Sequence, residues 1–146
     1  MSTTMTESRP RTDRGARQPT AIFSALVGLA GLAILLQGVW AGIFLEHDGA
    51  RDSSGGWIDV HARGGEVSIL LTLLAVGVVA AKLRQRRDLL VGGIALLVLL
   101  VFESYLGGLI RDDGKDTLTA VHVPLAMAIM GLAAWLPFRA RRPVAR

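Results

Sequence analysis

Four long apolar segments constrain the fold of this chain more than any other feature. An uninterrupted apolar stretch of about 18 residues or more is typical of a helix that crosses a membrane. Hydrophobic residues make up 51% of the 146-residue chain, so little sequence remains for a second, soluble domain. The sequence therefore predicts an all-α, polytopic membrane four-helix bundle with up-down-up-down order. The predicted spans are residues 21–45, 60–83, 89–110 and 120–138.

The predicted membrane domain covers residues 19–138 and is flanked by two polar tails. Residues 1–18 are rich in Ser, Thr and Arg and contain no aromatic residue, a composition typical of disorder. Pro19 suits the start of the first helix, and residues 139–146 form a second basic tail. Glycines predict the turns at the opposite end of the bundle, at Gly55–Gly56 and at Gly114.

The basic residues predict the orientation of the chain in the cell membrane. Twelve of the sixteen Lys and Arg residues lie in the two tails and in the short turn at residues 82–88, which four alternating spans place on one side. The positive-inside rule then puts both termini in the cytoplasm. These clusters flank spans and carry no aromatic platform, so the expected partner is the lipid bilayer, with its anionic headgroups, and not nucleic acid.

Two histidines stand at the same place on two different predicted helices. His61 follows Trp57 by four residues in "WIDVH", and His122 follows Leu118 by four residues in "LTAVH". Both helices run in the same direction, so the two histidines lie at similar depth. The two helices are diagonal in a four-helix bundle, with axes on the order of 11–14 Å apart. An interfacial or hydrogen-bonded role for each histidine is the simpler alternative.

These histidines are the best candidates for cofactor ligands. The chain has no cysteine, which excludes thiolate metal sites and the C-x-x-C-H attachment of c-type haem. Histidine is a usual axial ligand of haem iron, and bundle cores often hold such cofactors. The sequence therefore predicts that His61 and His122 ligate the iron of one b-type haem. A zinc site is less favoured because zinc needs three or four ligands.

Three charged residues are predicted to support the histidines. Glu103 lies roughly 10 Å below the end of the third helix, and an ionisable group at that depth tends to face the bundle interior. It would fix the tautomer of a histidine ligand, take part in a proton path, or bond to Gln37 as a protonated acid. Arg63 and Arg111, on the rim, are candidate partners for haem propionates, with simple surface snorkelling as the alternative.

The chain also has the pattern of a tandem two-helix repeat. The segments "LLQGVWAGIFLEHDG" and "LVFESYLGGLIRDDG", residues 35–49 and 100–114, can be aligned, and each precedes a helix that begins with a histidine. Internal repeats of membrane proteins often place the functional site at the interface between the repeats.

Two resemblances follow from these motifs. The order Q-x-x-x-A-G, W-x-x-x-H, E-x-x-x-G-G and L-x-x-x-H-x-P, over residues 35–136, resembles an uncharacterised family of small four-helix actinobacterial membrane proteins. This resemblance implies no particular activity. The chain is more distantly similar to one four-helix half of haem A synthase, which implies b-type haem between His61 and His122. That enzyme has an acidic residue three places before the first histidine, where this chain has Ile58, so the resemblance does not imply haem modification.

The expected role is one-electron transfer or haem handling, with a quinone or a redox partner protein. Two other functions fit the same sequence. One is a cofactor-free accessory or structural membrane protein. The other is a small proton-coupled carrier that uses Glu103 and the histidines as relays, which would need to assemble as a homo-oligomer because one bundle is small for transport.

Overall fold

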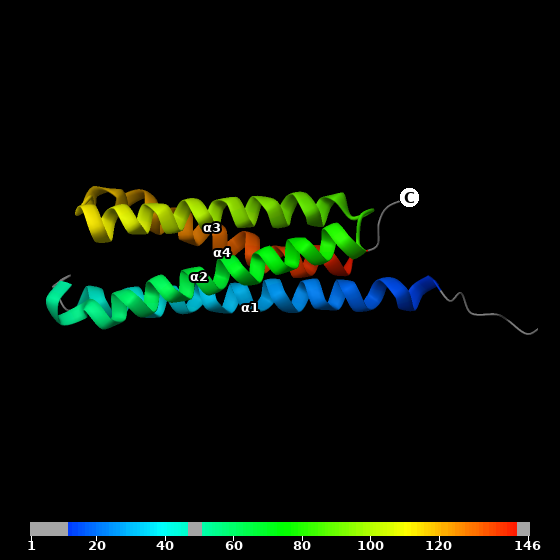
Figure 1. Cartoon of the computed structure of the whole chain (residues 1–146), viewed down its shortest axis with the longest axis horizontal. Coiled ribbons are helices and arrows are strands. Elements are labelled where there is room, and N and C mark those ends of the chain that lie inside the picture. The colour runs from blue at the N-terminus through cyan, green and yellow to red at the C-terminus, as the bar shows by residue number, and fades with distance from the viewer. Residues whose placement is uncertain (1–11, 47–50, 143–146) are drawn as a thin grey trace, which may run out of the picture.

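The computed structural model describes residues 12–46 and 51–142, and this part of the chain is almost entirely helical (Figure 1). The prediction of an all-helical chain with four long apolar helices is confirmed. A single 3₁₀ turn, η1, leads into the last helix. The elements are α1 (Thr12–Glu46), α2 (Arg51–Lys82), α3 (Arg87–Asp113), η1 (Asp116–Leu118) and α4 (Thr119–Arg141).

The four helices lie along one common axis, and each runs back beside the helix before it (Figure 1). Helix α1 packs against α2 and α4, and α3 packs against the same two helices, so α2 and α4 face each other across a diagonal. We call the end at which α1 begins and α4 ends the basic end. The opposite end, which carries His61 and His122, is called the histidine end.

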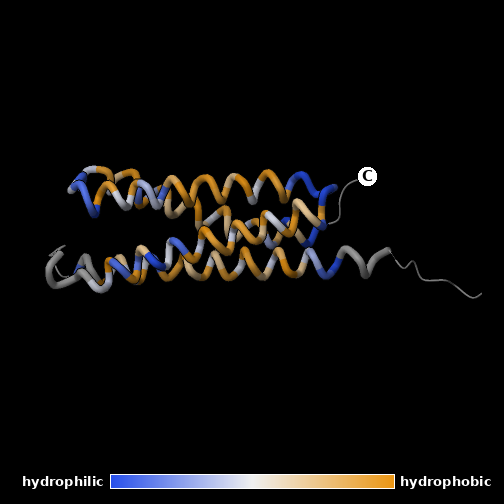
Figure 2. The backbone as a smooth tube through the Cα atoms, viewed as in Figure 1, coloured by the Kyte–Doolittle hydropathy of each residue, from blue (hydrophilic) through white to orange (hydrophobic). Residues whose placement is uncertain are grey.

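Each helix is long and apolar enough to cross a membrane. Hydrophobic residues predominate in the middle of every helix, and hydrophilic residues gather toward the ends (Figure 2). A helix of 27 residues is about 40 Å long, which exceeds the roughly 30 Å hydrocarbon core of a bilayer. The four stretches that meet the length and hydropathy requirements are Arg17–Ile43, Gly56–Lys82, Arg87–Asp113 and Asp116–Arg141.

Many of the large apolar side chains point away from the bundle. Met127 is 72% exposed, and Val91 and Phe138 are exposed to a similar extent. A soluble monomer rarely leaves apolar surface of this extent in water. The bundle surface therefore suits contact with lipid.

The tightly packed part of the core lies toward the basic end. Phe23 and Val27 from α1 meet Val79 from α2, Leu89 from α3 and Leu136 from α4, and all five are fully buried. The histidine end is lined instead by polar and small side chains. The core cluster therefore lies mainly in the half of the bundle at the basic end.

Two predicted boundaries are wrong. Helix α1 begins at Thr12 and not at Pro19, because Ala16, Arg17 and Gln18 favour helix. Gly55 and Gly56 lie inside α2 and not in a turn. That helix begins earlier because Asp and Ser residues at its start suit an N-terminal turn. Residues 1–11 of the predicted tail lie outside the described part of the chain.

Two other predicted turns are confirmed. Helix α2 ends at Lys82 and α3 begins at Arg87, which leaves the short connection that the sequence predicts. Gly114 ends α3 with a φ of 65°, a left-handed conformation that only glycine adopts without cost, and its N–H bonds to the Leu109 carbonyl. Pro124 lies inside α4, five residues after its first residue.

Candidate functional site

The structure brings the two histidines together at the centre of the histidine end. The ring centroids of His61 on α2 and His122 on α4 are 6.3 Å apart, and the ring planes make an angle of 54°. Both side chains are partly buried. The rings therefore face each other across the diagonal of the bundle and do not point to its outer surface.

Each ring has a contact at its Nδ1 atom with a neighbouring helix. The Nδ1 of His61 lies 3.2 Å from the backbone carbonyl oxygen of Gln37 on α1. Because a carbonyl only accepts, this contact is a hydrogen bond when Nδ1 carries the proton. The Nδ1 of His122 lies 3.1 Å from Oε1 of Glu103 on α3. The second pair is close enough to bond but is not aligned as a hydrogen bond.

One polar residue from each helix thus contributes to a single layer. The four residues are Gln37 from α1, His61 from α2, Glu103 from α3 and His122 from α4. Within the described residues, both carboxylate oxygens of Glu103 and the side-chain oxygen of Gln37 are buried without a hydrogen-bond partner. A buried polar atom without a partner costs about 1–3 kcal/mol. A layer that keeps several such atoms in an otherwise apolar bundle is a candidate binding site.

Glycines make room for this layer. A Cβ atom at Gly107 of α3 would lie 3.4 Å from Cε1 of His122, and a Cβ atom at Gly64 of α2 would collide with the side-chain amide of Gln37. Below the layer, the buried hydroxyls of Ser68 and Thr72 bond to backbone carbonyls of their own helix, so they add no unsatisfied donor. Gly64, Ser68 and Thr72 of α2 therefore face the inside of the bundle.

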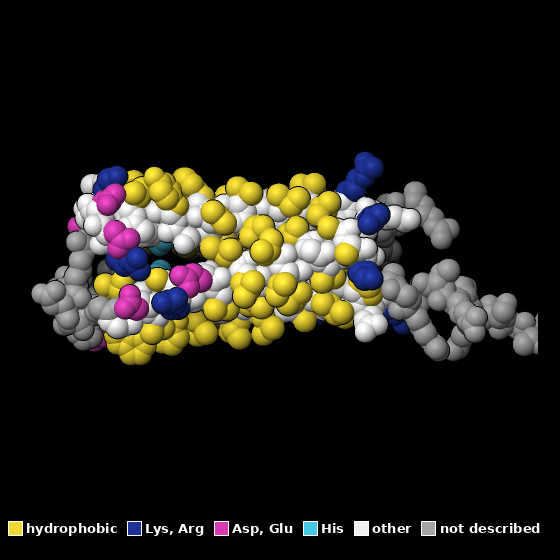
Figure 3. All heavy atoms as spheres, in the orientation of Figure 1, with side chains coloured by type: hydrophobic (Ala, Val, Ile, Leu, Met, Phe, Trp, Pro, Cys, Tyr) yellow, Lys and Arg dark blue, Asp and Glu magenta, His cyan; other side chains and the backbone are white. Residues whose placement is uncertain are grey.

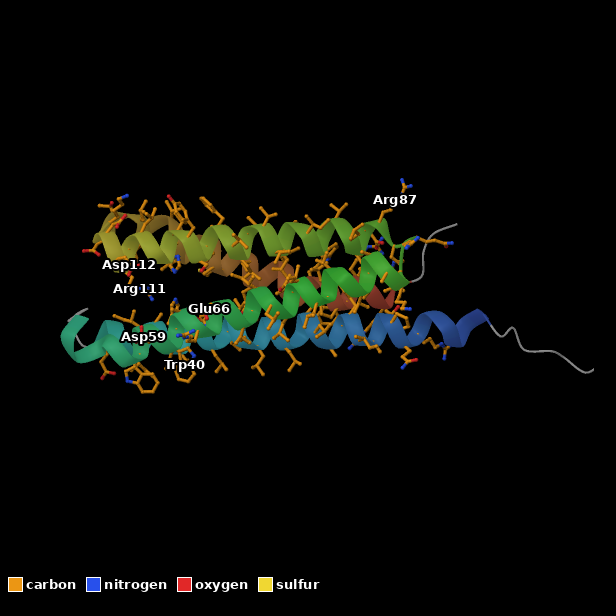
Figure 4. The ribbon with its side chains drawn as sticks, in the orientation of Figure 1. Trp40, Asp59, Glu66, Arg87, Arg111 and Asp112 are labelled. Carbon is orange, nitrogen blue, oxygen red and sulfur yellow. The ribbon has the colours of Figure 1, made fainter. Side chains whose placement is uncertain are left out.

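The surface above the histidines is hollowed, with charged side chains around the opening (Figure 3). Figure 4 shows Arg111 of α3 directed across this opening toward Asp59 and Glu66 of α2, and both carboxylates lie within electrostatic reach of its guanidinium. The Nε of Arg111 is 2.7 Å from Oδ1 of Asp112. Arg111 is therefore at the rim, as predicted, and has carboxylate neighbours there.

Arg63 pairs with a carboxylate of its own helix, α2, and is largely exposed. Its Nη1 is 3.3 Å from Oε2 of Glu66, and its side chain is 80% exposed. An exposed pair of this kind contributes little to stability, typically below about 1 kcal/mol. A contact of Arg63 with a bound group stays a prediction.

Two features of the structure were not predicted from the sequence. The rings of Trp40 and Trp57 stack between α1 and α2, with centroids 5.4 Å apart. At the basic end, Arg86 is buried and donates hydrogen bonds to Asp88 and to backbone carbonyls of α4. The sequence predicts no partner for either tryptophan and places Arg86 only among the basic residues of the turn at residues 82–88. Their pairing depends on helix rotation, which the hydropathy pattern does not fix.

The number of metal-ligating side chains in the layer of Gln37, His61, Glu103 and His122 limits which metal or cofactor it can bind. Among the described residues no group of three or more His, Cys, Asp or Glu side chains could hold a metal ion. Two opposed imidazoles fall short of the three or four protein ligands of zinc but equal the two axial ligands of haem iron. His47 lies outside the described residues.

Comparisons with known proteins add no family to these observations. No protein-family model, no curated protein and no solved structure matches this chain. The resemblances drawn from short motifs therefore remain expectations, and the function has to be inferred from the site itself.

Proposed function

We propose that this chain is a multi-pass protein of the cell membrane that binds one b-type haem for electron transfer or haem handling. In this proposal the four helices cross the membrane in up-down-up-down order, both termini lie in the cytoplasm, and the chain is a doubled two-helix hairpin. The membrane placement is supported by the length and hydropathy of the four helices, by their exposed apolar side chains and by the grouping of arginines at one end. The Trp40–Trp57 pair near the opposite end suits a membrane–water interface.

The distance between the two histidine rings carries the haem part of the proposal. With metal–nitrogen bonds of about 2 Å, and each nitrogen about 1.2 Å from its ring centre, two opposed imidazole centroids lie about 6.4 Å apart. The centroids of His61 and His122 are 6.3 Å apart. Because the Nδ1 atoms face Gln37 and Glu103, Nε2 would be the ligand nitrogen on both rings. The donor set and its spacing therefore fit the group.

The surrounding residues would tune such a site. A carboxylate beside Nδ1 fixes the tautomer of a histidine ligand and raises its basicity, and a small rotation would align Glu103 with His122 for that bond. The carbonyl of Gln37 would do the same for His61. A bound haem supplies one-electron chemistry, and the rim at Arg111 is where its propionates would meet a cation.

The visible absorption spectrum of the purified chain tests the proposal. We expect a Soret band and, after reduction, the sharp α and β bands of a low-spin, bis-histidine b-type haem, when haem is supplied during expression. Pyridine haemochrome analysis should give about one haem per chain, and the haem should be extractable because no cysteine is available to attach it. Colourless protein from haem-replete cells would contradict the proposal.

Two neighbouring glycines give a matched test of the site's shape. Gly107→Leu should lower haem content at least about tenfold, because the new side chain would extend beyond a Cβ that already lies 3.4 Å from His122. Gly108→Leu adds the same side chain where no atom lies within 4 Å, so it should leave haem content unchanged. The ratio of Soret to protein absorbance measures both. Equal effects of the two variants would rule out a fit at this layer.

A proton-coupled carrier is a second candidate because Glu103 and His122 form a buried acid–base contact between α3 and α4. It predicts proton flux into liposomes that is lost in Glu103→Gln, without any visible absorption. A cofactor-free accessory protein would show neither colour nor flux.

A further inference from the structure

A groove with a volume of about 920 Å³ lies between α1 and α4 at the basic end, far from the histidines. Ligand sites in proteins are typically about 300–1,000 Å³. Its mouth carries three arginines, and its wall and floor are made of two hydroxyl side chains and small apolar residues. The lining residues are Arg17, Thr20, Ala21, Ser24, Ala25 and Gly28 from α1, with Pro137, Ala140, Arg141 and Arg142 from the end of α4.

The groove changes from charged to apolar along the helix axis. Arg17, Arg141 and Arg142 lie at the ends of the apolar stretches of their helices, whereas Ala25 and Gly28 lie two to three turns deeper. A Cβ at Gly28 would meet no atom within 4 Å, so the deep part is open space next to the bundle. The guanidinium of Arg141 is 5.9 Å from the ring centre of the exposed Phe138, which places it at the boundary with lipid.

We infer that this groove is a binding site for one anionic phospholipid of the cytoplasmic leaflet. Phosphate is the group that guanidinium forks recognise best, and Thr20 and Ser24 provide hydroxyl donors just below the arginines. An acyl chain would lie along the small residues of α1. No acidic residue is among the described lining residues, so the charge at the mouth is complementary to a phosphodiester. The inference uses the membrane placement proposed above but not the haem.

The bundle offers a control at the same end. Lys82, Arg84 and Arg87 surround the α2–α3 turn and lie outside the groove. All three are exposed, and Figure 4 shows Arg87 directed away from the bundle. Replacing these three cations removes as much positive charge as replacing the three arginines of the groove. The two triple variants therefore separate a defined site from general attraction to anionic lipid.

Native mass spectrometry of the full chain tests the inference. The chain, purified in neutral detergent, is incubated with equal amounts of phosphatidylglycerol and phosphatidylcholine, and the retained lipids are counted. Wild type should retain one phosphatidylglycerol in preference to phosphatidylcholine. Arg17→Gln/Arg141→Gln/Arg142→Gln should reduce this retention at least about tenfold, because each basic residue near an anionic lipid contributes about 1 kcal/mol. Lys82→Gln/Arg84→Gln/Arg87→Gln should retain the lipid.

A second variant tests the shape of the groove with every arginine in place. Ala25→Leu/Gly28→Leu fills the apolar part and should also reduce retention of phosphatidylglycerol, while size-exclusion chromatography of the same sample reports folding. Equal loss of lipid in both triple variants would overturn the inference. So would displacement by inorganic phosphate as effective as displacement by a second phospholipid, because the acyl chain would then contribute nothing.

Discussion

Removal of either central histidine is expected to abolish stable haem binding. In His61→Ala or His122→Ala, the iron would lose one of its two protein ligands, and the haem retained after purification should fall at least about tenfold, because losing even a group that only orients a ligand typically costs about 10–100-fold in metal affinity. Any haem that remains should show a high-spin spectrum. The double variant should show no Soret band. Absorbance per chain, with size-exclusion chromatography to check folding, measures each effect.

Two controls make this result specific to the histidine pair. His47→Ala removes the third histidine of the chain and should leave the spectrum unchanged. His61→Gly and His122→Gly should regain a low-spin spectrum when free imidazole is added, because the small ligand can enter the space left by the ring. Haem that persists with an unchanged spectrum in the double variant would show that other residues hold it.

The sequence was sufficient to predict the helices because membrane spans are recognised by length and hydropathy alone. The same pattern predicted that His61 and His122 share one depth, since both lie close to the start of helices that run in parallel. It did not predict which way each ring turns. The facing of the two rings depends on helix rotation, and rotation here is set by side-chain packing around Phe23 and Leu136 at the other end.

Partner residues were predicted less well than the histidines themselves. The sequence predicted that the Glu103 carboxylate contacts a histidine or Gln37, and in the structure it lies 3.1 Å from Nδ1 of His122. Arg63 and Arg111 were treated alike because both lie on the rim, yet one is exposed beside Glu66 and the other reaches across the opening. Long charged side chains adopt many rotamers, so their spacing in the sequence does not determine their partners.

The contact of Arg86 with the end of α4, at the basic end, was also not predicted from the sequence. The positive-inside rule counts Arg86 together with its neighbours, although its environment is different. Its guanidinium is almost entirely buried. It binds both carboxylate oxygens of Asp88 at 3.1 Å and the carbonyl oxygens of Arg139 and Ala140 at 3.0 and 3.1 Å. The last carbonyls of a helix have no partner within that helix, so Arg86 links the α2–α3 turn to the end of α4.

Arg86→Gln is therefore expected to destabilise the bundle by about 2–4 kcal/mol, because two carbonyls lose their donor and Asp88 keeps only Arg139 of its two cationic partners. For a chain of this size the loss corresponds to a drop of roughly 6–12 °C in the unfolding midpoint. Heating in detergent, followed by size-exclusion chromatography of the soluble fraction, measures it. Arg86→Lys should lie between wild type and Arg86→Gln, because an ammonium keeps the charge but not the planar fork.

Arg84→Gln is the matched control, two residues away in the same turn. Arg84 is exposed and donates one hydrogen bond, of 3.3 Å, to the Ala80 carbonyl in the last turn of α2. A surface substitution of this kind changes stability by no more than about 0.5 kcal/mol. Equal midpoints for the two variants would mean that the α4 carbonyls find other donors and that apolar packing alone joins α4 to the turn. A large loss confined to Arg86→Gln would identify this guanidinium as the connection.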